Sequence, residues 1–266
     1  MVEVSTAAVT YSVDGGVAAI KLNRPAASNA LNRTTKEMLL HVLSGISADS
    51  SVRAVLLSAS GRNFCVGQDL AEHIEGLRDD PSHAMDTVRE HYNPIVQALH
   101  DIEVPIVAAI NGACVGAGLG LALAADIRIA ASGAKFSTAF TGIGLAADSA
   151  LSATLGKLIG VGRASALFML GDAIDATTAE SWGLVNRVVA DEELPEAAAE
   201  LAVRLAAGPT AAYKAVKALL NVNASAPLRQ VLDSEADAQQ RLGISTDHTA
   251  AVEAFLAKTR PVFVGH

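Results

Sequence analysis

The sequence twice places a short apolar stretch directly before a glycine-containing turn and the start of a helix. "VRAVLLSAS" precedes "GRNFCVGQDL", in which Asp69 stands near the expected N-cap, and "VPIVAAI" precedes "NGACVGAGLGLALAADI". Such turns leave backbone N–H groups at a helix N-terminus without partners, and their glycines allow close approach of another group. Each turn alone is also compatible with ordinary strand-to-helix packing. Two such N–H donors that converge on one oxygen form an oxyanion hole.

The rest of the pattern indicates an α/β fold. "VTYSVDGGVAAIKL" is typical of a hairpin, "RTTKEMLLHVLSGI" has helical spacing, and "DIRIAAS" and "AKFST" are typical of short strands. This order predicts strands stacked in layers with helices outside. After Arg163 the chain is predicted to be largely helical, and "LPEAAAELAVRLAAG" is expected to have Pro195 near its start and Gly208 at its C-cap. The polar stretch 71–81 is interpreted as a surface or lid segment.

The overall composition excludes several classes of protein. A chain of 266 residues can bury a large core without a disulfide or a metal. Its net charge of −8 argues against general nucleic-acid binding, although a small anionic ligand needs only a local basic patch. Cys65 and Cys114 lie far apart in the sequence, which predicts neither a disulfide nor a zinc site and favours a reducing compartment. No export signal or membrane-spanning stretch is recognisable, so we expect a cytoplasmic protein without membrane contacts.

No cofactor or metal motif is convincing. "GIGLAA" has the spacing of a dinucleotide fingerprint, but the stretch before it is a poor buried strand, and "LGKL" lacks the spacing of a P-loop. Neither an HExxH motif nor a paired-cysteine metal site is present. The histidines of the lid region and of the helix after it are interpreted as solvated or packed, not catalytic: His73, His83, His91 and His100.

Asp148 is the only charged residue between Lys135 and Lys157. The segment "DSALSATL" that it opens reads as a helix, and aspartate is a preferred N-cap, so Asp148 could be an inert, solvated cap. Its neighbours are apolar, however. A desolvated carboxyl has a raised pKa, which is what a general base near neutral pH requires. Both interpretations remain open from the residues alone.

Five segments in order resemble the crotonase (enoyl-CoA hydratase/isomerase) superfamily: "LNRPAASNALN", "GRNFCVGQDL", "IVAAINGACVGAGLGLALAADIRIAA", "GDAIDATTAESWGLVNRVV" and "EAFLAKTRPVF". The resemblance covers essentially the whole chain. It implies an α/β fold, a spiral of repeated ββα turns over residues 1–200 that binds acyl-CoA, with a C-terminal helical region over 201–266 that forms homotrimers or hexamers. It also implies an acyl-CoA thioester substrate, with no metal and no cofactor apart from the CoA of the substrate.

By position, the resemblance makes the backbone N–H groups of Gln68 and Ala117 the oxyanion donors. It places the CoA site around Ser28 and its neighbours, and it implies that Phe255 and Lys258 reach CoA from a neighbouring subunit. The full set of substrate-binding residues that it implies is Arg24, Ser28, Asn29, Ala30, Val66, Gly67, Asp69, Leu70, Gly116, Phe140, Phe255 and Lys258.

The departures from the family decide the predicted reaction. Hydratases of this family use two glutamates, and the matching positions here are Gly120 and Phe140. "FSTAFTGIGLAADSA" instead resembles the loop of 1,2-epoxyphenylacetyl-CoA isomerases and related Δ3,Δ2-enoyl-CoA isomerases, in which one aspartate is the acid/base; here this is Asp148.

We therefore predict an acyl-CoA isomerase that shifts a double bond, or opens or rearranges an epoxide, through a thioester enolate. One alternative is an enoyl-CoA hydratase of fatty-acid or aromatic-acid catabolism, such as phenylacetate catabolism. In that case the lid acids Glu72, Glu75 or Glu90 could supply the missing carboxylate. A second alternative is a catalytically reduced acyl-CoA-binding subunit.

Overall fold

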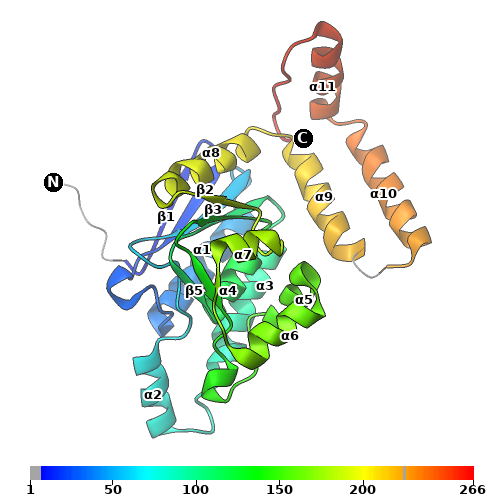
Figure 1. Ribbon diagram of the computed structural model, residues 1–266. Helices are drawn as coiled ribbons and strands as arrows, with labels where there is room; N and C mark the ends of the chain where they lie inside the picture. Colours follow the sequence, from blue (N-terminus) through cyan, green and yellow to red (C-terminus); the bar gives the residue numbers. More distant parts are fainter. Residues whose placement is uncertain (1–6, 224–225) are drawn as a thin grey trace, which may run out of the picture.

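A computed structural model describes residues 7–223 and 226–266 (Figure 1). The predicted hairpin is present, and its second strand begins a parallel sheet in which neighbouring strands follow the order β1-β2-β3-β4-β6-β9. The strands of this sheet are β1 (Val9–Asp14), β2 (Val17–Leu22), β3 (Ala54–Ala59), β4 (Ile106–Ile110), β6 (Ile127–Ala131) and β9 (Arg187–Val189). β1 alone is antiparallel to its neighbour.

A second, smaller sheet lies beside the first. Its strands are β5 (Ala113–Val115), β7 (Lys135–Ser137) and β8 (Ile174–Asp175). Two single bridges extend this layer toward the N-terminus, one joining Cys65 to Cys114 and the other joining Leu31 to Gln68. The chain thus passes repeatedly from the large sheet to the second layer and then into a helix. This confirms the expected spiral of ββα turns.

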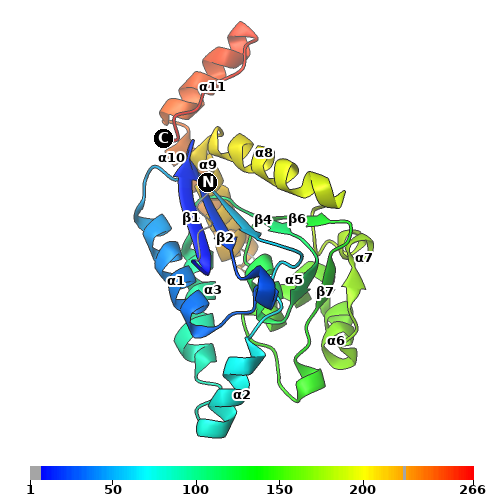
Figure 2. The ribbon, with the colours of Figure 1, turned by 90° about the vertical axis from the view of Figure 1, so that its left-hand side faces the viewer.

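Helices cover both faces of the large sheet, which explains its continuously apolar strands. Ile106, Ala108 and Ile110 of β4 belong to the main core, whereas Val107 and Ala109 pack with α8 on the opposite face. Figure 2 shows α8 and α1 on opposite sides of the sheet. The α-helices of the body are α1 (Arg33–Ala48), α2 (Leu70–Asp79), α3 (Asn93–Asp101), α4 (Ala117–Leu123), α5 (Leu151–Ile159), α6 (Val161–Leu170), α7 (Ala176–Ser181) and α8 (Leu194–Ala206). Short helical turns are η1 (Pro25–Ala27), η2 (Val88–Tyr92), η3 (Thr141–Ile143) and η4 (Asp191–Glu193).

The last three helices project from this body (Figure 1): α9 (Thr210–Asn223), α10 (Leu228–Leu242) and α11 (Thr246–Ala257). α8 still packs on the sheet through Ala206, so the change from packed to projecting helices follows it. Its C-cap is Ala207, one residue before the predicted Gly208. None of the helices within residues 7–223 and 226–266 is both long and apolar enough to span a membrane.

Candidate active site

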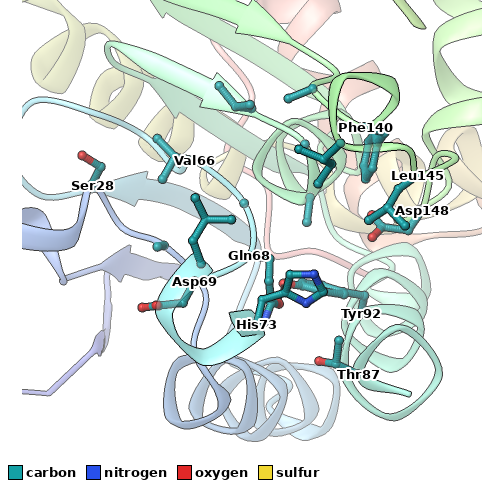
Figure 3. A pocket seen from close by; sticks show the side chains of 18 of the residues that line it. Ser28, Val66, Gln68, Asp69, His73, Thr87, Tyr92, Phe140, Leu145 and Asp148 are labelled. Atoms are coloured by element: carbon teal, nitrogen blue, oxygen red, sulfur yellow. Dashed lines mark hydrogen bonds between the residues drawn. The ribbon is translucent and has the colours of Figure 1, made fainter. Parts of the chain in front are cut away.

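A cavity of about 520 Å³ opens where the two glycine-containing turns meet the start of α2, the segment before η2 and the loop that carries Asp148 (Figure 3). Most of the predicted site residues line it: Ser28, Ala30, Val66, Gly67, Gln68, Asp69, Leu70, Gly116, Ala117, Phe140 and Asp148. The fold therefore brings together segments from three turns of the spiral that are far apart in the sequence.

The two turns approach each other closely because glycine occupies their inner positions. Gly67 has φ +86°, and Gly116 has φ 55° and ψ −126°, a conformation that residues with a side chain rarely adopt. A methyl group added to Gly67 would lie 3.4 Å from the backbone nitrogen of Ala117. The backbone of the first turn thus lies against the start of α4.

Each turn has, at a residue that lines the cavity, a backbone N–H without a backbone acceptor. The bridge between Leu31 and the first turn uses the carbonyl of Gly67 and the N–H of Asp69, which leaves the N–H of Gln68 without an acceptor in the described part of the chain. Ala117 is the first residue of α4, where an N–H has no intrahelical acceptor. Two such donors beside one cavity can stabilise an oxygen that becomes negative during a reaction.

The interpretation of Asp148 as a helix cap is wrong. α5 begins at Leu151, its N-cap is Ala150, and no side chain caps it. Ser149 and Ala150 both adopt positive φ, 50° and 60°, and this turns the chain between Asp148 and the helix. The carboxyl group of Asp148 is consequently free to line the cavity instead of binding the α5 N-terminus.

Asp148 is half-buried, and this burial raises the pKa of its carboxyl group. The Ser149 hydroxyl donates a 2.8 Å hydrogen bond to its Oδ1 and moderates the rise. Tyr92 lies on the same cavity, and its own pKa is raised by burial and then by the negative charge of Asp148. A carboxyl group at the cavity wall with a raised pKa accepts a proton more readily than an exposed one, which suits it to an acid/base role.

The position that carries a glutamate in the family's hydratases has no space for a side chain here. A Cβ added to Gly120 would lie 2.4 Å from the Cβ of Ser149 and 2.9 Å from its carbonyl oxygen. Gly120 therefore allows the Asp148 loop to pack directly on α4. The other position, Phe140, is buried and lines the cavity with an aromatic ring.

The second carboxylate on the cavity wall is tied to other groups. Asp69 forms a 2.9 Å ion pair with Arg24 and caps α2 by accepting from the N–H of Ala71. Burial alone would raise the pKa of Asp69, but the hydrogen bonds from Arg24 and from the start of α2 outweigh it and lower the pKa. Asp69 is consequently a fixed anion and not a proton donor near neutral pH.

The three lid acids do not reach the cavity. Glu72 accepts hydrogen bonds from the backbone N–H of Arg33, at 2.6 Å, and from Lys36 Nζ, at 3.0 Å. Burial alone would raise the pKa of Glu72, but these bonds lower it. Glu75 and Glu90 are exposed, and neither is among the lining residues. Among the described lining residues, Asp148 is therefore the one carboxyl group with a raised pKa.

Four predicted residues lie outside the cavity wall. Arg24 is held by Asp69, and Asn29 is buried in hydrogen bonds to the carbonyls of Ser60 and Asn63, so both shape the loop that carries Ser28. Phe255 lies on α11 and is 83% exposed, and Lys258 is the C-cap of that helix. α11 and α2 lie at opposite ends of the molecule in Figures 1 and 2. A single chain does not bring Phe255 and Lys258 to the cavity, and their expected role across a subunit interface stays a prediction.

Several lining residues were not predicted. His73, interpreted from the sequence as solvated or packed, lines the cavity together with Thr87 and Tyr92 (Figure 3). Its position one helical turn after Asp69 is a signal that could have identified it. The Tyr92 hydroxyl donates to the side-chain oxygen of Gln68. Nothing in the sequence indicated that contact. The apolar end of the cavity adds Met85, Ile143 and Leu145.

A cavity that combines free backbone N–H groups with one carboxyl group of raised pKa is typical of enzymes that stabilise enolates. A sequence model of the enoyl-CoA hydratase/isomerase family matches residues 12–266, and the chain belongs to this family, within the crotonase superfamily.

Relatives named as isomerases and relatives named as hydratases are both similar to this protein over almost the whole chain. The 1,2-epoxyphenylacetyl-CoA isomerase of Escherichia coli K12 is 38% identical over 95% of this chain and 97% of the relative. A Rhodobacter capsulatus protein described as an enoyl-CoA hydratase is 40% identical over 97% of this chain and 98% of the relative. A crystal structure from Mycobacterium abscessus, assigned to the enoyl-CoA hydratase/isomerase group, is 67% identical with a TM-score of 0.97, covering 97% of this chain and all (100%) of that one. Both hydratases and isomerases are thus among the relatives.

Proposed function

We propose that this enzyme is an acyl-CoA isomerase with a single acid/base residue, Asp148. The observation that carries the proposal is the pairing of Asp148 with Gly120. Asp148 is the one lining carboxyl group of raised pKa among the described residues. Because Gly120 has no side chain, the loop that carries Asp148 and Ser149 can pack directly against α4. The likeness to the E. coli epoxyphenylacetyl-CoA isomerase supports it.

In the proposed reaction the thioester oxygen lies between the N–H groups of Gln68 and Ala117. The carboxylate of Asp148 removes a proton from a carbon next to the double bond. The electron pair moves toward the thioester oxygen, and the thioester becomes an enolate. The two N–H donors stabilise this charge. Asp148 then returns the proton to another carbon of the conjugated system. The reaction is a net proton transfer without a change of oxidation state, so no redox group is required. The two N–H donors carry the stabilisation of the enolate in this proposal, and CoA enters as part of the substrate.

An absorbance assay of thioester conjugation tests the proposal. Wild type is expected to convert a 3-enoyl-CoA into the conjugated 2-enoyl-CoA, and Asp148→Asn is expected to lose this activity while it keeps its affinity for the thioester. The same proteins are also offered a 2-enoyl-CoA, from which hydration removes the conjugation. Hydration by wild type that survives in Asp148→Asn would identify a hydratase with another acid. Thioester binding without either reaction would identify a binding subunit.

We further propose that the chain assembles as a homotrimer, or as a hexamer of two trimers, through its projecting C-terminal helices. The proposal is supported by large apolar side chains that this region leaves exposed: Leu220, Ile244, Val252, Phe255 and Leu256. Burial of such side chains is the main driving force of obligate association. Light scattering coupled to gel filtration is expected to give three or six times the mass of one chain. A monomer at working concentration would contradict this proposal and leave the Asp148 mechanism untouched.

A further inference from the structure

Lys36 is a charged side chain that the fold buries almost completely. It lies on α1 with 1% of its surface exposed, on the same helix face as the core residues Leu39 and Leu43. Burying an ammonium group costs several kcal/mol unless the charge is paired and hydrogen-bonded. Lys36 is not itself among the lining residues of the cavity, but it contacts two that are, Gln68 and Thr87.

Three partners satisfy Lys36, and each belongs to a segment that forms the cavity. Its Nζ lies 3.0 Å from Glu72 Oε1 on α2, 2.7 Å from the hydroxyl of Thr87, and 3.3 Å from Oε1 of Gln68. The first two contacts join α1 to α2 and to the segment just before η2. The third reaches Gln68, a lining residue whose backbone N–H has no acceptor in the described part of the chain.

The side chain of Gln68 is consequently held at both of its polar atoms. Its Oε1 accepts from Lys36 and from the Tyr92 hydroxyl, and its Nε2 donates to Glu72 at 3.3 Å. These bonds anchor the Gln68 side chain, so a movement of the turn that displaced the Cα of Gln68 would strain or break them. The Lys36–Glu72 pair is neutral overall, so its effect on the site is mainly one of position.

We propose that Lys36 is a positioning residue, which acts through the Gln68 side chain to hold the Gln68 N–H on the thioester oxygen. The inference rests on the proposed oxyanion role of that N–H. It does not depend on Asp148 being the acid/base. It adds to the proposed reaction a residue on α1 that neither lines the cavity nor contacts Asp148.

The test uses Lys36→Met, which keeps the length and apolar stem of the side chain but removes its three donors. The matched control is Lys217→Met, because Lys217 also forms an ion pair, 2.8 Å from Asp126, with only 11% of its side chain exposed, and it is not a cavity residue. Both variants are expected to lose stability. Only Lys36→Met is expected to change the oxyanion site.

The probe is cinnamoyl-CoA, which has no proton that an isomerase can shift along its chain. Its absorption moves to longer wavelength when its thioester carbonyl is polarised by hydrogen bonds. Wild type and Lys217→Met are expected to show the full shift at saturation, and Lys36→Met less than half of it. With a 3-enoyl-CoA, kcat is expected to fall roughly 10- to 100-fold in Lys36→Met, with KM within about 3-fold of wild type.

An unchanged absorption shift in folded, saturated Lys36→Met would overturn the inference, as would an equal loss in Lys217→Met. If Lys36→Met does not fold, Gln68→Met releases the same side chain while it keeps the backbone N–H, and a full shift in that variant would overturn the inference instead. A wild type that polarises cinnamoyl-CoA without isomerising a 3-enoyl-CoA would refute the proposed function. In that case a reduced absorption shift in Lys36→Met would still support the positioning role of Lys36.

Discussion

Gly120→Ala adds one methyl group at the contact between α4 and the Asp148 loop. The new Cβ would lie 2.4 Å from the Cβ of Ser149 and 2.9 Å from a backbone oxygen, whereas optimal contacts between carbon atoms are about 3.5–4.0 Å. The loop must therefore retreat by about 1 Å. Overpacking of this type lowers the free energy of unfolding by roughly 1–3 kcal/mol, and the better helix propensity of alanine raises it by about 1 kcal/mol. Because a backbone oxygen must move, we expect an overpacking cost near the upper end of that range and a net loss of stability of about 2 kcal/mol.

For a chain of this size that loss corresponds to a fall in Tm of about 4–8 °C, measured by circular dichroism. The displaced loop carries the proposed acid/base, and a misplacement of about 1 Å can reduce the rate of the chemical step by about 100-fold. Gly45→Ala is the control, because nothing lies within 4 Å of its added Cβ and it also replaces a helical glycine. It should keep full activity and gain roughly 0.5–1 kcal/mol. A Gly120→Ala protein with the Tm and kcat of wild type would refute the reasoning.

Three further predictions follow from the pKa shifts. Asp148 must be ionised to act as a base, so kcat/KM should fall as the pH drops through its raised pKa; Ser149→Ala, which removes the hydroxyl that lowers this pKa, should move the acid limb of the profile to higher pH. A carboxyl group whose pKa is raised by folding stabilises the protein below its unfolded pKa and loses this contribution as the pH rises through the folded value. Asp148→Asn should therefore have a higher Tm than wild type at neutral pH. A lower Tm would contradict the burial argument. Burial raises the pKa of Cys65 to about 12 and that of Cys114 well above its usual range, so a thiol reagent should label neither in the native enzyme and both after denaturation, as read by mass spectrometry.

Much of the fold could be predicted because its elements have strong local signals. The hairpin, the apolar strands and the two glycine turns are defined by alternation, short apolar runs and glycines that the backbone requires. The second sheet was less visible, because β5 and β8 are only 3 and 2 residues long. Cys65 and Cys114, distant in the sequence, are neighbours across that layer, and this proximity depends entirely on the winding of the chain.

The site was predictable where it is made of backbone and less so where it depends on packing. The cap interpretation of Asp148 failed because Ser149 and Ala150 adopt positive φ, a choice that neither residue type signals. Lys36 stands at a core-facing position of α1, and a lysine in an apolar stripe could have predicted a buried charge. Its partners could not be predicted, because they come from the first glycine turn, from α2 and from the segment before η2.

Product analysis in D2O tests the central claim, that Asp148 alone moves a proton on an enolate held by two backbone N–H groups. A 3-enoyl-CoA is converted in D2O, and the product is examined by mass spectrometry for wild type and Asp148→Asn. The account predicts a conjugated isomer from wild type, part of which retains the original proton because one carboxyl group removes and returns it, and no product from the variant. A product that has gained the elements of water, formed at an undiminished rate by Asp148→Asn, would contradict the account.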